Sequence, residues 1–395
     1  VWTWIRLSYA PSQSPAICNP VHRIQLHYTL SRDAGDAQIR NPLPEMLEAV
    51  AQQGSISAAA RTLGMSYRHV WGALKRWEEQ LGGELIIWGK GQSAQLSEFG
   101  TKLLWAERQA QARLAPQIAA LHADLERAFA VAFDDSAHVL TMYASHDDAL
   151  ASLRAHAATP GTSGALHLDI RFTGSVDAIR ALNEGRCTLA GFHTLEQPAA
   201  TSLAARTYKP LLQPGLHKII GFARRTQGLI VAKGNPLGLQ SLTDVARTGA
   251  RFANRPLGSG TRVLLEDLLA QEGLTGQHIA GFERDETSHT AVAQAVVSGA
   301  ADAGLGIEMV ARARGLDFVP LVDERYHLAC LKATLEQPAT RALRELLLTR
   351  VWQDHLASLP GYSPMHSGQV LAMSNVLPWW DFTRPKRPSA HRKKP

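Results

Sequence analysis

The most constraining feature of the sequence is a run of three short helical patterns separated by two tight turns, between residues 43 and 81. Leu43, Leu47 and Val50 give the first pattern an apolar stripe. Gly54-Ser55-Ile56-Ser57 predicts a turn whose hydroxyls cap the second helix. Leu63-Gly64-Met65-Ser66 predicts a tighter turn, in which Gly64 adopts a positive φ and Ser66 caps the third helix. Because Ala58, Ala59 and Ala60 are small, these helices can approach closely.

The third helix is predicted to carry a basic, exposed face. Its apolar positions, spaced i, i+4, i+7 and i+11, are Val70, Leu74, Trp77 and Leu81, and its other face shows Tyr67, Arg68, Trp71, Lys75 and Arg76. No acidic residue occurs between residues 49 and 77. A basic helix after a tight turn is what insertion into the DNA major groove requires. Two alternatives stay open, since Trp71 could pack on a neighbouring helix and Arg76 could simply be solvated.

A two-stranded wing is predicted to follow, with strands at residues 85–88 and 94–96 and Lys90 at the tip, within reach of a phosphate. The string GSISAAARTLGMSYRHVWGALKRWEEQLG resembles the helix-turn-helix of the LysR and ModE regulators, and the resemblance covers residues 43–105. It implies a winged helix-turn-helix that binds an operator in double-stranded DNA. Arg68 is the best candidate for a contact to guanine, and Tyr67 could contact a phosphate or a thymine methyl. The candidate DNA-binding residues are Ser55, Ser57, Ser66, Tyr67, Arg68, Trp71, Lys75 and Lys90.

Residues 98–130 are predicted to form a long linker helix. Apolar residues recur close to helical spacing at Leu103, Ala110, Leu114, Ile118, Leu121 and Leu125,. Pro116 is expected to kink the helix or to start a second segment. An exposed apolar stripe needs a partner, which predicts a homodimer or a dimer of dimers. The alternative is that the stripe packs on its own domain.

From residue 138 onward, apolar strands end in Gly/Ser/Thr turns that lead into helices, which is typical of an α/β domain with parallel strands. The strings TGSVDAIRALNEG, QGLIVAKGNPLGLQSLTDV, RFANRPLGSGTRVLLEDLL and HTAVAQAVVSGAADAGLGI resemble the periplasmic-binding-protein-like (type II) domain of some molybdenum-associated proteins. The resemblance implies two lobes joined by crossing strands near residues 228–233 and 318–329, with a ligand between them. The implied ligand-binding residues are Ser145, Thr173, Gly174, Ser175 and His193 from one lobe and Ser259, Gly260, Thr261, Arg262, Ser288 and Thr290 from the other.

Helix N-termini, glycines and hydroxyls are suited to binding an anion. Arg262 is the one nearby positive charge that the sequence suggests, and it either pairs within its helix or clamps the ligand. His146 and His193 are more typical of loop histidines, and Asp147-Asp148 is expected to begin a helix. Molybdate or tungstate is the favoured effector, because both halves resemble molybdenum-linked families. Formate, other small carboxylates, sulfate-like anions and a pterin remain alternatives, since no ModE-like β-barrel domain is recognisable.

The expected layout is multidomain: a disordered extension (1–20), the α+β winged helix-turn-helix (21–97), the linker helix (98–130), the two-lobed domain (138–380) and a disordered basic tail (381–395). The tail holds six basic residues, which equals the net charge of +6.

The three cysteines form no CxxC pair, which argues against disulfides and structural zinc. We expect a cytoplasmic regulator without membrane association, metal or prosthetic group. Familiar catalytic motifs are absent, so no enzymatic activity is expected. Contrasting hypotheses are a molybdenum-cofactor maturation or carrier protein and a constitutive architectural DNA-binding protein.

Overall fold

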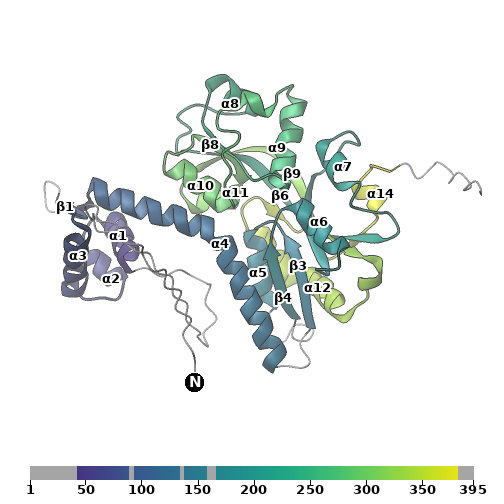
Figure 1. Ribbon diagram of the computed structural model, residues 1–395, viewed down its shortest axis with the longest axis horizontal. Helices are drawn as coiled ribbons and strands as arrows, with labels where there is room; N and C mark the ends of the chain where they lie inside the picture. The colour runs from purple at the N-terminus through teal and green to yellow at the C-terminus, as the bar shows by residue number, and fades with distance from the viewer. Residues whose placement is uncertain (1–41, 89–92, 134–137, 158–165, 381–395) are drawn as a thin grey trace, which may run out of the picture. The chain divides into compact units, whose positions relative to one another are not determined.

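A computed structural model describes residues 42–88, 93–133, 138–157 and 166–380 (Figure 1). Several sequence predictions lie outside these ranges: the extension at 1–20, Lys90 and the basic tail.

The N-terminal part forms the three helices and the wing as predicted. The helices are α1 (Pro42–Gln53), α2 (Ile56–Thr62) and α3 (Tyr67–Leu81), and the wing strands are β1 (Ile86–Trp88) and β2 (Ala94–Leu96). The Ser55 hydroxyl accepts a hydrogen bond from the backbone N–H of Ala58 at 3.4 Å, and Ser66 caps α3 at 3.2 Å. Gly64 has φ of +65°, which explains why the turn between α2 and α3 requires glycine,.

Glu78, near the end of α3, connects this helix to the wing. Its Oε1 accepts hydrogen bonds from the backbone N–H groups of Leu85 (2.8 Å) and Ile86 (3.2 Å), and its Oε2 pairs with Lys75 at 2.6 Å. Burial raises the pKa of Glu78, but these hydrogen bonds lower it more, so that the net pKa lies below its usual value. The carboxylate is therefore a fixed anchor for the first wing strand.

We predict that Glu78→Ala destabilises the winged domain by about 1–3 kcal/mol, because two part-buried backbone N–H groups lose their acceptor. Glu79→Ala, on the exposed side of the same helix, is the matched control and should change little. Thermal unfolding of the full chain, followed by tryptophan fluorescence, measures the difference. Equal unfolding temperatures for the two variants would show that Glu78 does not anchor the wing.

The linker is a single helix, α4 (Glu98–Phe133). Of the two outcomes expected for Pro116, a kink or a second segment, the second segment is wrong, since the assigned helix continues through it. Leu104 and Ala112 are buried. Phe99, Leu114 and Leu121 leave 38%, 36% and 53% of their surface exposed, so part of the predicted stripe faces solvent.

The C-terminal part is built on one mixed sheet in the order β4-β3-β5-β9-β6-β8-β7. The first lobe holds the parallel strands β3 (His138–Ala144), β4 (Leu166–Phe172) and β5 (Leu189–Leu195). The second lobe holds β7 (Phe252–Ala253), which pairs in parallel with β8 (Ala303–Ile307). The short strands β10 (Tyr362–Ser363) and β11 (Val370–Leu371) pair with β6.

Two long antiparallel strands, β6 (His217–Val231) and β9 (Asp317–Leu331), run through both lobes (Figure 1). Their ladder shifts register between Gln227 and Gly228. This confirms the predicted pair of crossing strands, but β6 begins eleven residues earlier than the predicted segment at 228–233. The two lobes thus share one continuous pair of strands.

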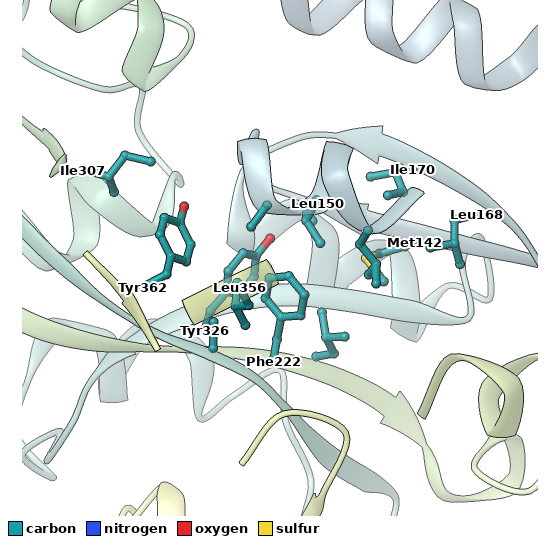
Figure 2. Close-up of a cluster of buried hydrophobic side chains, with 14 of the residues drawn as sticks. Met142, Leu150, Leu168, Ile170, Phe222, Ile307, Tyr326, Leu356 and Tyr362 are labelled. Atoms are coloured by element: carbon teal, nitrogen blue, oxygen red, sulfur yellow. The ribbon is translucent and has the colours of Figure 1, made fainter. Parts of the chain in front are cut away.

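Helices cover the sheet. In the first lobe these are α5 (Asp148–Ala157), α6 (Ser175–Asn183), α7 (Leu203–Tyr208), α12 (Pro338–Leu348), α13 (Arg350–Ser358) and α14 (Met373–Val376). In the second lobe they are α8 (Leu242–Thr248), α9 (Gly260–Gln271), α10 (His289–Val297) and α11 (Glu308–Ala313), with a single 3₁₀ turn at Gly276–His278. A second 3₁₀ turn, Lys332–Thr334, follows β9 in the first lobe. Figure 2 shows part of the first-lobe core, in which the rings of Phe222 and Tyr326 pack edge to face, 5.0 Å apart. This packing fixes β6 and β9 against the first lobe.

Candidate DNA-binding and ligand sites

The side of α3 that the sequence predicts to face DNA is exposed in the structure. Tyr67 and Trp71 leave 46% and 43% of their surface exposed, and Arg68 and Arg76 are exposed as well. Burial of Trp71 against a neighbouring helix is therefore not what the structure shows. The hydroxyls of Ser55 and Ser66 are engaged as helix caps, Ser57 is exposed, and Lys75 pairs with Glu78.

The two lobes touch where α6 and α9 begin. The backbone N–H of Val176 donates to the carbonyl of Gly258 at 3.2 Å. A Cβ on Gly174 would lie 2.7 Å from that same carbonyl oxygen, and a Cβ on Gly260 would lie 2.5 Å from Cδ2 of His193. Only glycine permits this approach at both positions. The predicted turns from opposite lobes are therefore in direct contact.

Several predicted ligand-binding residues gather at this junction. Ser145 and Ser175 are buried, with their hydroxyl oxygens 3.3 Å apart. Ser259 caps α9 through the N–H of Arg262, and Thr173 bonds through its N–H to the carbonyl of Ala144. His193 is buried, but it lies inside β5 rather than in a loop after it.

The two predicted ligand-binding residues at the start of α10, Ser288 and Thr290, have less support from the structure for that role. Ser288 caps the helix through Ala291 N–H, and its hydroxyl donates to the backbone carbonyl of Ala112 in α4. Thr290 is half-buried. The hydroxyl of Ser288 is therefore already used by the protein itself.

A buried ion cluster lies at the centre of the junction, around Arg225 in β6. Its guanidinium pairs with Asp147, which caps α5, and with Glu324, its cross-strand neighbour in β9. The Tyr362 hydroxyl donates to Asp147 Oδ2 at 2.8 Å. All four residues are buried. The pairing holds the first lobe to the two crossing strands.

A chain of polar contacts leads from this cluster to the second lobe. The side-chain amide of Gln227 donates to Glu324 Oε1 at 3.0 Å and to the Thr261 hydroxyl at 3.4 Å. That hydroxyl lies 3.4 Å from Nε2 of His289. We call the buried set Asp147, His193, Arg225, Gln227, Arg255, Thr261, His289 and Glu324 the lobe junction.

Arg255 is the exceptional member of the lobe junction. It is 4% exposed, and its Nε and Nη1 have no hydrogen-bond partner. Burial, followed by the nearby charge of Arg225, lowers its pKa to about 10, although Asp285 opposes the shift. It lies close enough to His146, His193 and His289 to lower the pKa of each. A buried guanidinium with free N–H groups favours the binding of an anion.

Arg262, the predicted anion clamp, is engaged within the second lobe. Its Nε donates to Glu266 at 2.9 Å, its Nη1 lies 3.5 Å from Asp285, and its guanidinium stacks on Phe282 at 3.9 Å. This bears out the alternative that it pairs within its own helix. The expectation that Arg262 is the one nearby positive charge is wrong, because Arg225 and Arg255 are both at the junction.

His193 and His289 of the lobe junction, and His146 beside it, are neutral at pH 7. Burial is the largest cause in each case, and neighbouring arginines add to it: the pKa of His146 falls to about 4, and those of His193 and His289 fall well below 6.5. Neutral imidazoles can donate at one ring nitrogen and accept at the other. The positive charge that is available to an anion therefore comes from the arginines.

Sequence reasoning missed Arg225, Arg255, Gln227, Glu324 and His289. Arg255 stands inside the string NRPLGSGTR, which was singled out for its glycines and for Arg262. Arg225 and Glu324 lie in polar stretches, residues 224–227 and 323–325, that interrupt strands with apolar residues on both sides, and a charged residue that is buried in a strand usually has a buried partner. That interruption was the available signal.

Comparison with known families decides the identity of the N-terminal domain. Residues 44–101 match the bacterial regulatory helix-turn-helix proteins of the lysR family, and residues 157–348 match the PBP superfamily domain. The chain therefore carries a lysR-family helix-turn-helix domain, followed by a PBP superfamily domain. The likeness to ModE and to molybdenum-associated domains stays a prediction.

Relatives of the chain include two uncharacterized proteins. YvgK of Bacillus subtilis is 33% identical over 202 residues, which are 51% of this chain and 64%, or less than two thirds, of YvgK. A Clostridium pasteurianum protein from the 5′ region of the ferredoxin 2Fe-2S gene is 31% identical over 110 residues, 28% of this chain and 97% of that protein.

Among solved structures, full-length CbnR complexed with its target DNA is 18% identical and has a TM-score of 0.37, with 77% of this chain and 97% of CbnR covered. HinK from Pseudomonas aeruginosa is 17% identical and has a TM-score of 0.37, with 76% and 94% covered. At these values, the structural likeness supports no inference about function.

Within residues 42–88, 93–133, 138–157 and 166–380, no group of three or more His, Cys, Asp or Glu side chains is placed to hold a metal. Within the same ranges, no helix combines the length and apolarity that crossing a membrane requires. Cys187 and Cys330 are buried free thiols.

Proposed function

We propose that the chain is a LysR-family transcriptional regulator, which binds duplex DNA through α3 and responds to a small anionic ligand held between the two lobes. The single observation that carries the ligand proposal is Arg255, whose buried guanidinium has two unpartnered nitrogens at the lobe junction. Buried charges without a partner are costly, and binding an anion removes that cost. Molybdate, tungstate, formate and other small carboxylates are the candidates that the sequence suggested. We expect the protein to act in the cytoplasm, where its DNA lies.

A thermal-shift screen of the full chain tests the ligand proposal. Molybdate, tungstate, sulfate, phosphate, formate and small organic acids are each added over a concentration series. A ligand at 100 times its Kd should stabilise the chain by about 2.7 kcal/mol. If no anion raises the unfolding temperature, the lobe junction is not an anion site. Such a result would leave the DNA-binding assignment untouched.

For DNA binding, we predict that Arg68→Ala costs about 1–3 kcal/mol at a selected operator and relaxes specificity at one base pair. Arg247→Ala, an exposed arginine of the second lobe, is the matched control and should leave affinity unchanged. Fluorescence anisotropy with duplexes selected from a random pool measures the affinity and the base specificity of each variant. Parental affinity and specificity in Arg68→Ala would show that α3 does not read bases through Arg68.

We also propose that α4 forms the dimer interface. Leu114 and Leu121 are partly exposed on this helix, and a second copy of the same stripe could cover them,. A two-fold dimer would read half-sites about one helical turn apart, or a multiple of that distance. Light scattering should therefore give at least a dimeric mass at micromolar concentration, and Leu121→Glu should reduce it. A monomeric parent protein with an asymmetric footprint on DNA would exclude this interface.

A further inference from the structure

The lobe junction also offers hydrogen-bond acceptors without a donor. Gln227 Oε1 and Glu324 Oε2 are buried and have no partner, and the Tyr326 hydroxyl nearby is likewise unpartnered. Buried polar atoms in proteins are nearly always hydrogen-bonded, so each such atom marks a position where a partner is required. The unsatisfied atoms at this junction therefore include donors on Arg255 and acceptors on Gln227 and Glu324.

The orientation of the Gln227 amide is fixed by its neighbours. Its Nε2 donates to Glu324 Oε1 at 3.0 Å, and the reversed orientation would place two oxygens against each other. The free atom is thus the amide oxygen, which accepts and cannot become a donor. Protonation of Glu324 would make its own oxygen a donor, but it would not change Gln227.

The charges at the lobe junction also disfavour a bare dianion as the ligand. Arg225 faces two carboxylates, Asp147 and Glu324, whereas the unpartnered nitrogens of Arg255 leave it able to meet one anionic group. A bare dianion such as molybdate or tungstate would present only acceptors to Gln227 and Glu324. Since the two arginines already balance the two carboxylates, a dianion would leave two negative charges uncompensated in a buried place, which is more unfavourable than the single charge of a carboxylate.

We infer that the ligand carries both an anionic group for Arg255 and at least one N–H or O–H donor for Gln227 and Glu324. This inference rests on the proposed anion site and narrows its chemistry. Amino acids, hydroxy acids and a pterin carboxylate belong to this class. Molybdate, tungstate, sulfate, formate and acetate do not, because at neutral pH they offer acceptors only.

Matched ligands test the inference on the full chain by calorimetry at pH 7.5. Acetate, glycolate and glycine differ mainly in the hydrogen-bond donor on one carbon. Molybdate and sulfate are further ligands without a donor, and pterin-6-carboxylate is a further ligand with one. We expect at least one donor-bearing ligand to bind tenfold or more tightly than acetate and molybdate. Which donor-bearing ligand binds best distinguishes an amine, a hydroxyl and a pterin source.

The variant Gln227→Met keeps the side-chain length and removes the amide. It should reduce the affinity for the donor-bearing ligand at least tenfold and leave the weak affinity for acetate unchanged, while Gln240→Met outside the junction changes neither. If molybdate or tungstate binds as tightly as the best donor-bearing ligand, or if Gln227→Met binds like the parent, the inference is wrong and the anion site stands. If no compound of either class binds, the proposed anion site fails with it.

Discussion

Replacing Arg225 by methionine should lower the free energy of unfolding of the two-lobed domain by about 3–5 kcal/mol. The reason is that Asp147 and Glu324, both buried, would lose the cation that compensates them. Removing one partner of a buried ion pair leaves an uncompensated charge, which is among the costliest single changes in a folded protein. Methionine fills a similar volume, so that the loss would report on charge rather than on packing.

The adjacent Arg224 provides the control for this prediction. Its side chain is 35% exposed and pairs with Asp323 and Glu196, which are also partly exposed. Exposed pairs contribute at most about 1 kcal/mol, so Arg224→Met should be mild. Urea unfolding of the full chain gives both values. Similar losses for Arg224→Met and Arg225→Met would mean that the buried cluster has no special structural role.

Replacing Arg255 by methionine should have the opposite effect and raise the free energy of unfolding of the ligand-free chain by about 1–3 kcal/mol. A pKa lowered from 12.5 to about 10 means that folding penalises the charged guanidinium by roughly 3 kcal/mol, and lost packing reduces the gain,. Because the group is basic and its folded pKa is depressed, the penalty is present at all pH values below about 10. It disappears only as the pH rises through that value.

The same substitution should abolish stabilisation by an anionic ligand, since Arg255 supplies the unpartnered donors. Arg255→Lys retains the charge but loses the planar pair of N–H groups, and should bind the ligand more weakly than the parent does. Urea unfolding with and without ligand measures both effects. If Arg255→Met were strongly destabilised and still stabilised by the ligand, Arg255 would be a structural residue only.

The helix-turn-helix was predictable because its signals are local. Ser55 and Ser66 cap the helices that directly follow them, Gly64 turns the chain beside them, and the spacing of Val70 and Leu74 identifies the buried face. Each of these signals acts within one helical turn. The sequence therefore predicted both the elements and the exposed basic face of α3.

The lobe junction was only partly predictable, because its charged residues depend on long-range strand pairing. The turns at Gly174 and Gly258 could be read from residue type, but no local pattern shows that Arg225 lies opposite Glu324, 99 residues away. Arg262 looked like the anion ligand from its position at the start of α9. Besides Glu266 in its own helix, it pairs with Asp285, which comes from a loop whose path the sequence does not reveal.

The most direct test of the central claim measures DNA affinity as a function of ligand. The full chain and Arg255→Met are titrated onto a selected duplex by fluorescence anisotropy, at fixed salt, with and without the best ligand from the calorimetric series. The account predicts that the ligand changes the DNA affinity of the parent about 5- to 150-fold, the usual range of coupling between two sites, and leaves that of Arg255→Met unchanged. An equal response of both proteins, or no response of either to any anion, would contradict it.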